Sequence, residues 1–363
     1  MMQRLAILFL LLFASTLPGL VAGDEEYWEY TFRPGDSIWK IAEKYTTTVD
    51  NWLEIRELNK IHEGPDRRIP PGTRIIIPVS MLKLQPVPAL VIAVSGGPGL
   101  VRANGEALEA VVGMQLFSGD RIVTGNGQSL RMQFADESEL QVLPGSEVVL
   151  DKLSHHKHTG MVDTRLRLNS GRISTRVKKL KPDSHYEIKT PAATTAVRGT
   201  EYRLSSESVL LSRAEITEGT IGVSAGGTDK DVKEGYGIVA EKDKPLPEPV
   251  KLLPAPTISD NLSVDKSMLQ VSWDELEGAE SYRYQVAKDE QFNDVVIDNS
   301  TVDSKIEIKD LLPGRYYLRV RGVDRYKLEG FDAIRDYEIL EPPAEEDRSW
   351  IVILPIGIML LVL

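Results

Sequence analysis

Apolar and polar residues follow two different periods along the chain. Near the N-terminal end, four apolar residues recur at i, i+3, i+4 and i+7: Ile38, Ile41, Ala42 and Tyr45. This spacing would place them on one face of an α-helix. After residue 85 the period changes to two, in short runs separated by turn residues, which is typical of half-buried β-strands. The sequence therefore predicts a small module with helices, followed by a long, mainly β remainder.

Residues 27–79 predict a strand, two helices and a second strand. Residues 28–32 alternate, Pro34-Gly35-Asp36 is a turn, and Asp36 is expected to cap the first helix. The second helix is expected over about residues 49–58, with Thr48 as its cap and Asn59 as its end. Residues 70–78 then turn the chain into a closing strand. Two strands with both helices on one face would make a small α+β module of βααβ order.

Residues 91–241 predict many short strands. Turn residues at Gly119-Asp120 and Gly125-Asn126-Gly127 separate alternating runs. Residues 214–217 and 220–223 flank Glu218-Gly219 and are expected to form a hairpin. Strands repeating every 8–12 residues or so indicate a sandwich, roll or solenoid and argue against a parallel α/β sheet.

Two proline-containing segments, residues 81–90 and 245–256, indicate linkers. Residues 254–341 then alternate again, with Trp273 at a sheet-facing core position, which predicts a separate β-sandwich. The expected fold class is therefore multi-domain and mainly β: an α+β module, an all-β central domain and a sandwich.

Both ends of the chain are apolar. Arg4, the apolar run over residues 5–13 and the small residues Val21-Ala22-Gly23 indicate a secretory signal peptide over residues 1–23, with an uncleaved anchor helix as the alternative. Residues 350–363 are almost wholly apolar. As a helix they would reach only about 21 Å, short of the roughly 30 Å hydrocarbon core of a bilayer. This segment is either a short membrane tail or a terminal strand or helix that packs on the protein.

Composition narrows the function classes. The chain has no cysteine, which excludes disulfides, thiolate nucleophiles and cysteine-ligated zinc. A formal net charge of −11 argues against nucleic-acid binding. The sequence has no His-Glu-x-x-His pair or phosphate loop. We therefore expect a protein that is not an enzyme and needs no cofactor or metal.

Two polar clusters suggest other chemistry. His155, His156 and His158 would hold a divalent ion only loosely, so a solvated loop is favoured. Residues 152–181 are locally basic and would suit an anionic polymer or lipid surface. A solvated sheet face balanced by nearby acids is the favoured interpretation.

The first module resembles a LysM domain. The resemblance rests on YTFRPGDSIWKIAEKY at residues 30–45, on the Leu58-Asn59 step and on PPGTRIIIP at residues 70–78, although the loop over residues 61–69 is longer than usual. It implies binding to peptidoglycan glycan strands that contain N-acetylglucosamine. The implied carbohydrate site joins residues of two loops: Gly35, Asp36, Ser37 and Ile38 with Asn59, Ile61 and Pro70. Alternatively, these residues only cap, turn and pack.

The central region resembles a FecR-type domain. Four segments carry the resemblance in the family's order: residues 119–125, 134–140, 168–173 and 190–202, of which TPAATTAVRGTEY at 190–202 is the most distinctive. Asp136-Glu137-Ser138 departs from the usual Asp-Gly-Ser. The name-giving regulator carries a cytoplasmic tail and a membrane helix before this domain. Here a signal peptide and a LysM-like module precede it, so sigma-factor control through such a tail is not expected.

Residues 311–320, LLPGRYYLRV, resemble the corner of a fibronectin type III domain. In that resemblance Tyr317 is the corner tyrosine, whose hydroxyl bonds back to nearby backbone. Such domains most often serve as spacers or docking surfaces.

These patterns together predict an exported, periplasmic or envelope protein that binds peptidoglycan through its LysM-like module and presents a FecR-like domain as an interaction scaffold. The alternative is a membrane-tethered envelope signalling or sensory component that acts through the FecR-like domain. The expected partners are peptidoglycan and an envelope protein, with membrane contact through the C-terminal tail.

Overall fold

The computed structural model describes residues 27–61, 69–156, 160–181, 184–197, 199–259, 263–265 and 268–339. The expected signal peptide and the apolar segment 350–363 lie outside these residues. The chain divides into two compact units, Met1–Lys83 and Leu84–Leu363. Within the described ranges, no helix is long and apolar enough to cross a membrane.

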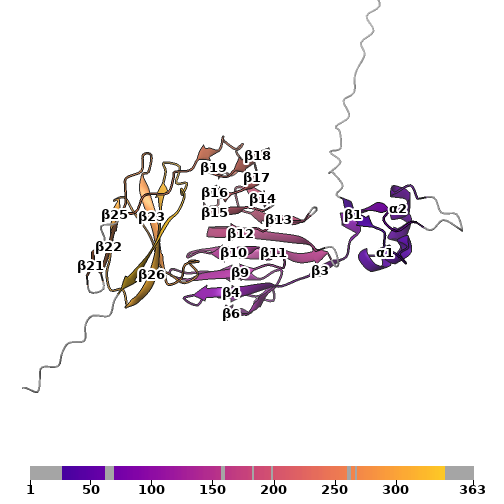
Figure 1. Cartoon of the computed structure of the whole chain (residues 1–363), viewed down its shortest axis with the longest axis horizontal. Coiled ribbons are helices and arrows are strands. Elements are labelled where there is room, and N and C mark those ends of the chain that lie inside the picture. Colours follow the sequence, from indigo (N-terminus) through magenta and orange to yellow (C-terminus); the bar gives the residue numbers. More distant parts are fainter. Residues whose placement is uncertain are drawn as a thin grey trace, which may run out of the picture. The chain divides into compact units, whose positions relative to one another are not determined.

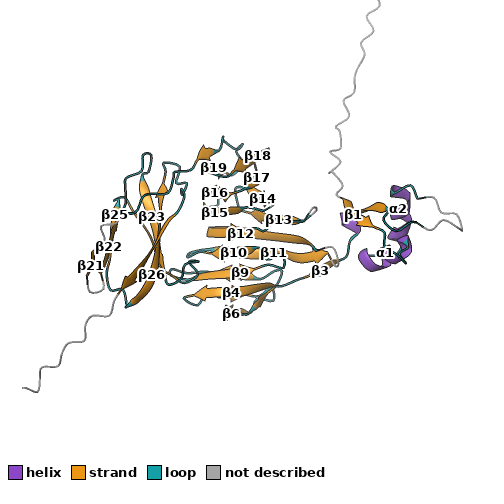
Figure 2. Ribbon diagram, in the orientation of Figure 1, coloured by secondary structure: helices purple, strands orange, loops and turns teal. Residues whose placement is uncertain are grey.

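The N-terminal unit has the predicted βααβ order, and the α-helices of the described chain lie in it (Figure 2). Strands β1 (Tyr27–Thr31) and β2 (Arg74–Pro78) pair antiparallel. Helices α1 (Ile38–Tyr45) and α2 (Asn51–Leu58) come between them in the sequence, and the 3-10 turn η1 (Val79–Met81) comes after β2. The four apolar residues predicted to share one face of α1 are all buried, which confirms that prediction.

The helix caps differ from the prediction. Ser37, not Asp36, caps α1, since its Oγ accepts the N–H of Lys40 at 3.2 Å. Helix α2 begins at Asn51, later than predicted, and its N-cap residue Asp50 makes no side-chain capping bond. Residues 47–50 form a turn first, in which the hydroxyl of Thr48 accepts the N–H of Asp50 at 3.4 Å.

The central domain consists of strands β3–β20 in two sheets that share one long strand, β12 (Met161–Arg176) (Figure 1). The first sheet has the order β6-β5-β8-β11-β12-β13-β14-β17-β18, with β3 also paired to β11. The second has the order β7-β4-β9-β10-β12-β15-β16-β19-β20. Because β12 belongs to both, the two sheets are joined at this strand.

The other strands of the first sheet are β3 (Leu84–Pro86), β5 (Gly99–Val101), β6 (Ala107–Glu109), β8 (Arg121–Val123), β11 (Glu147–His156), β13 (His185–Lys189), β14 (Thr194–Val197), β17 (Thr220–Ala225) and β18 (Thr228–Lys233). Those of the second are β4 (Ala89–Ser95), β7 (Gln115–Leu116), β9 (Ser129–Gln133), β10 (Glu139–Val142), β15 (Glu201–Ser208), β16 (Leu211–Glu218), β19 (Tyr236–Glu241) and β20 (Val250–Lys251). Strands β3 and β20 thus lie inside the segments expected to be linkers.

Gly171 lies where β12 passes from the first sheet to the second. Its φ is +88°, and a Cβ there would sit 2.4 Å from the Cα of Ser146. Only glycine fits such an approach of two backbones. The Ser-Gly step of the FecR-like motif therefore has a mechanical role: it lets one strand serve both sheets.

The hairpin predicted around Glu218-Gly219 is not formed. Strand β16 pairs with β15 and β19 in the second sheet, whereas β17 pairs with β14 and β18 in the first. Gly219, with φ +83°, packs against Thr200, where a Cβ would lie 2.7 Å from its Cγ2. The turn therefore carries the chain across the core from one sheet to the other.

Residues 258–339 form a sandwich of two antiparallel sheets, as predicted. One sheet has the order β21-β22-β25 and the other β24-β23-β26-β27. The strands are β21 (Ser263–Asp265), β22 (Met268–Ser272), β23 (Ser281–Ala287), β24 (Val295–Thr301), β25 (Lys305–Ile308), β26 (Gly314–Val323) and β27 (Ala333–Ile339). Trp273 is buried in the core between the sheets and packs edge-on against Tyr282.

The corner tyrosine is Tyr316, not the predicted Tyr317. The Tyr316 hydroxyl donates to the carbonyl oxygen of Leu312 at 3.0 Å, and the ring is buried in the core. Tyr317, the next residue of β26, points to the opposite face because side chains alternate along a strand. There it packs against Arg315.

Candidate functional site

A hollow of about 600 Å³ lies beside the first turn of the N-terminal unit. Its lining residues are Phe32, Arg33, Pro34, Gly35, Asp36, Ser37, Ile38, Lys40, Ile69 and Pro71; we call this hollow the groove. All four site residues predicted from the first loop are among them. Ile69 and Pro71 form the facing side, so the second loop contributes through neighbours of the predicted Pro70.

The turn that forms one wall of the groove is fixed by Asp36. Its Oδ2 accepts the hydroxyl of Tyr30 at 2.6 Å and the N–H of Arg33 at 2.7 Å. Burial and this carboxylate raise the pKa of Tyr30, so the phenol stays a hydrogen-bond donor. Gly35 adopts φ +86° at the apex, a left-handed conformation that glycine takes at little cost. The wall is therefore held by local hydrogen bonds.

Asn59, a predicted site residue, joins α2 to β2. Its Nδ2 donates to the carbonyl oxygens of Ile55 and Ile76, and its Oδ1 accepts the N–H of Ile76, each at 2.7 Å. These three bonds use both amide N–H groups and the carbonyl. Asn59, Ile61 and Pro70 are absent from the groove lining. The structure thus gives Asn59 a clear scaffolding role.

Several lining residues were missed from the sequence. Lys40 lies one helical turn beyond Asp36, and its Nζ donates to the carbonyl oxygen of Gly35 at 3.1 Å. Helical spacing places i and i+4 together, so this neighbour could have been anticipated. Ile69 and Pro71 flank Pro70 in the same segment, and only the fold shows which of the three faces the groove.

The structure describes part of each polar cluster of the central domain. In the part of the chain that the structure describes, no group of His, Asp and Glu could hold a metal; His158 lies outside that part. The arginines of residues 152–181 pair with acids: Arg165 with Asp163 at 2.9 Å, and Arg167 with Asp151 at 2.7 Å. The favoured interpretation of that basic segment, charges balanced by nearby acids, is confirmed for these pairs.

Buried charges join the central domain to the sandwich; we call this layer the interdomain joint. The central domain contributes Arg172, Arg203, Arg213 and Glu215, and the sandwich contributes Arg283, Asp298, Arg321, Glu329 and Asp332. Arg172 lies 3.0 Å from Asp298, and Arg203 donates to the carbonyl oxygens of Glu329 and Gly330, each at 2.7 Å. No sequence pattern pointed to this layer.

The joint separates the protonation states of two glutamates. Burial works to raise the pKa of Glu329, but the surrounding guanidinium groups, Arg321 foremost, lower it to about 2. Burial raises the pKa of Glu215 to about 7, with Glu329 adding to the shift and Arg203 opposing it. Glu215 accepts the backbone N–H of Glu329 at 3.4 Å. One carboxyl is therefore held ionised while the other titrates near neutrality.

The fold defines a modular protein in which a small βααβ module comes before two β domains in the sequence. The family model for the LysM domain matches residues 30–78, and the model for FecR protein matches residues 120–222. The chain thus carries a LysM domain and a FecR domain, followed by a fibronectin type III-like sandwich. LysM domains bind peptidoglycan that contains N-acetylglucosamine, and both families are binding or signalling domains rather than catalytic ones.

No curated protein matches the chain. Among solved structures, it is similar to a protein described as a putative anti-sigma factor from Parabacteroides distasonis, with 12% identity over 36% of this chain and 58% of that one, and a TM-score of 0.29. It is also similar to a segment of two fibronectin type III domains from chicken tenascin, with 14% identity over 47% of this chain and 93% of that one, and a TM-score of 0.20. At TM-scores this low, neither likeness says anything about function.

Proposed function

We propose that this protein belongs to the cell envelope and is not an enzyme. In this proposal it holds peptidoglycan glycan strands in the groove of its LysM domain and presents the FecR domain, with the sandwich docked on it, as a scaffold for an envelope partner. The observation that carries the proposal is the groove itself. Residues 35–38 of the family motif line an open hollow, where Gly35, Asp36 and Ser37 are at least partly exposed and Ile38 is buried.

The chemistry of the groove suits an amino sugar. N-acetylglucosamine offers an amide donor, an amide acceptor and an apolar methyl group. Ile69, Pro34 and Pro71 supply apolar contacts at the surface of the groove, whereas Phe32 and Ile38 are each only 2% exposed. The N–H groups of Ile38 and Trp39 open helix α1 and precede any intrahelical acceptor, as first-turn amides do. A few directed polar groups on an apolar surface are the usual make-up of a small-molecule site.

An exported location is part of the same proposal. The apolar segment and small-residue site of residues 1–23 support it, and peptidoglycan lies outside the cytoplasmic membrane. The absence of cysteine from the chain is compatible with an oxidising compartment.

The test is binding of the full-length protein to purified peptidoglycan and to N-acetylglucosamine oligomers. We expect co-sedimentation with peptidoglycan, and amide NMR shifts at Gly35, Ser37 and Ile38 on titration with chitotriose. Pro71→Trp, which adds bulk at the exposed rim of the groove, should weaken binding roughly tenfold or more.

Leu53→Trp is the matched control, since Leu53 is exposed on α2 and outside the groove lining. It should bind like the parent protein. If folded protein stays in the supernatant and its amide signals do not move, the proposal is wrong.

A further inference from the structure

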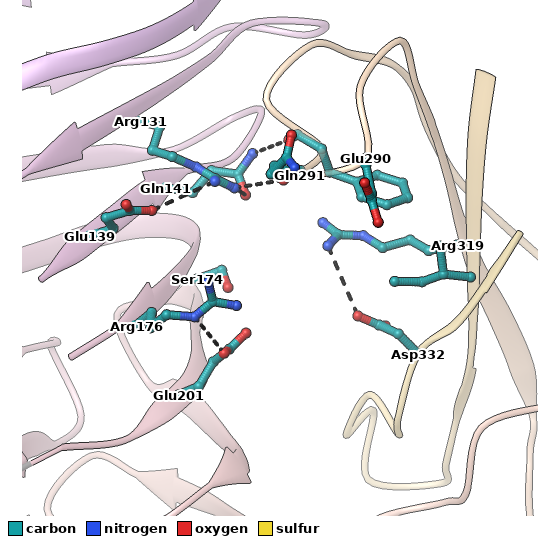
Figure 3. Close-up of a pocket in the computed structure, with 12 residues that line it drawn as sticks. Arg131, Glu139, Gln141, Ser174, Arg176, Glu201, Glu290, Gln291, Arg319 and Asp332 are labelled. Carbon is teal, nitrogen blue, oxygen red and sulfur yellow. Dashed lines mark hydrogen bonds and ion pairs between the residues drawn. The ribbon is translucent and has the colours of Figure 1, made fainter. Parts of the chain in front are cut away.

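A second cavity, of about 320 Å³, lies between the central domain and the sandwich (Figure 3). This volume is far above the roughly 10–15 Å³ that one water needs. One wall is the outer face of the second sheet, where Glu139, Arg176 and Glu201 stand opposite one another across β10, β12 and β15. The sandwich supplies the other wall through Glu290, Arg319 and Asp332. The cavity is thus large enough for a small organic molecule.

The wall on the central domain is held in place by its own contacts. Arg176 donates to Glu201 at 2.8 Å. Arg131 donates to the carbonyl oxygen of Gln291 at 2.8 Å, and Gln141 donates to that of Phe292 at 2.6 Å. These bonds tie the loop that carries Glu290 to the sheet. The charges of this wall are therefore largely matched, and the cavity is formed before any ligand enters.

Arg319, on the opposite wall, is only weakly matched. Its guanidinium lies over the ring of Phe292, at 4.2 Å from the centroid, and its Nε donates to Gln285 at 2.5 Å. Its nearest carboxylate, Asp332, is 4.0 Å away, and 14% of the side chain is exposed. Burial and the nearby Arg321 lower the pKa of Arg319 to about 9. An added carboxylate in the cavity would give this weakly paired guanidinium a second acidic partner.

Glu290 lies on the same wall and supplies the complementary charge. It is exposed, and among the described residues it forms no ion pair or hydrogen bond. Figure 3 shows its carboxylate close to the end of Arg319, on the same side of the open space. Across the whole lining, four acids face three arginines, so a simple anion would meet one excess negative charge. A molecule that carries both an ammonium and a carboxylate meets no such penalty.

We propose that this cavity binds a small zwitterion of the amino-acid or short-peptide class, with its carboxylate on Arg319 and its ammonium on Glu290. Arg–carboxylate pairing is directional and strengthens in a partly buried site. Asp332 and Glu201 border the space but already have arginine partners. The proposal does not depend on the LysM groove, which lies in the other unit.

The test is calorimetric titration of the full-length protein with alanine, alanyl-alanine, N-acetyl-alanyl-alanine and alanyl-alanine amide at millimolar concentration. We expect heat from a ligand with both free ends and none from either capped dipeptide. If alanyl-alanine binds more tightly than alanine, the ligand is a short peptide. If alanine binds more tightly, the ligand is a free amino acid. No heat from either free ligand would overturn the proposal.

Two variants test which side chains bind the charged ends of the ligand. Glu290→Gln and Arg319→Gln should each weaken binding of the free ligand roughly tenfold or more. Arg315→Gln, on the same strand but exposed and paired with Asp336, is the matched control and should bind normally. If Arg319→Gln fails to fold, Glu290→Gln and the capped ligands still test the proposal. Undiminished binding by folded Glu290→Gln, or equal heat from capped and free ligands, would contradict the assignment.

Discussion

The groove of the LysM domain and the interdomain joint are both built from polar contacts, but over very different distances along the chain. In the groove, Tyr30 bonds to Asp36 and Lys40 to Ser37, six and three residues apart. In the joint, Arg172 meets Asp298 and Arg213 bonds to the carbonyl oxygen of Tyr326, 126 and 113 residues apart. A short motif can encode the first kind of site but not the second.

The two regions also differ in exposure. The groove opens to solvent, so its exposed residues, such as Pro34 and Pro71, can be exchanged with modest loss of stability. The joint buries its charges: Glu215 and Arg321 are each only 3% exposed. Removing one partner of a buried pair leaves an uncompensated charge. Mutations in the joint should therefore destabilise the protein more than mutations near the groove.

The largest effect is expected from Arg321→Met. Arg321 lies 2.6 Å from Asp332 and 2.7 Å from Glu329, and its loss would leave two buried acids without their main cation. Breaking such a pair costs about 3–5 kcal/mol, measurable as a downshifted calorimetric transition of the Leu84–Leu363 unit. Arg315→Met, at an exposed pair on the same strand, should leave that transition in place. Equal shifts in both variants would refute the view that burial makes the joint costly.

The next largest loss of stability is expected from Asn59→Ala, in which the N-terminal unit should unfold more easily. It removes three hydrogen bonds to the backbone of Ile55 and Ile76, and part-buried groups left unpaired cost about 2 kcal/mol in total. Chemical denaturation followed by NMR signals of this unit would measure the loss, with Asn51→Ala in the same helix as control. Unchanged stability combined with lost peptidoglycan binding would instead make Asn59 a ligand of the sugar.

Glu215 should make the joint pH-dependent. Its pKa in the folded protein, about 7, lies above the ordinary value of 4.5. The stability linked to Glu215 is thus fully present below about pH 4.5 and is lost as the pH rises through about 7. Glu329 has the opposite sign: its contribution is present above about pH 4.5 and is lost as the pH falls toward about 2.

Thermal unfolding between pH 5 and 8 measures the effect of Glu215. In the parent protein the unfolding temperature should fall as the pH rises over this range, and Glu215→Gln should flatten that fall. Glu207→Gln, at the exposed acid paired with Arg213, should keep it. A decline that persists in Glu215→Gln would assign the pH dependence to another group.

The smallest effect is expected at the corner of the sandwich. Tyr316→Phe removes one hydrogen bond, to Leu312, and should cost about 1 kcal/mol. Tyr317→Phe is the matched neighbour and should be nearly neutral. Urea unfolding of both variants tests the assignment, and a larger loss in Tyr317→Phe would restore the position predicted from the sequence.

Three predictions from the sequence were wrong, each for its own physical reason. The phase of alternation in β26 decides between Tyr316 and Tyr317, and a shift by one residue exchanges the two faces of a strand. Glu218-Gly219 has the composition of a hairpin turn, but turn residues do not say which sheet the next strand will join. Ser37 and Asp36 are both good capping residues, and the bond of Asp36 to Tyr30 leaves the cap to Ser37.

Residue patterns alone were enough to predict the order of modules, the buried face of α1, the core position of Trp273 and the turn that lines the groove. Each depends on residues close together in the chain, where periodicity and turn chemistry act directly. The packed fold was needed to show that β12 serves two sheets, that Asn59 ties α2 to β2, and that Arg172 meets Asp298. Those contacts join distant segments, and which charges end up together depends on how whole sheets pack, because no local pattern records a partner more than a hundred residues away.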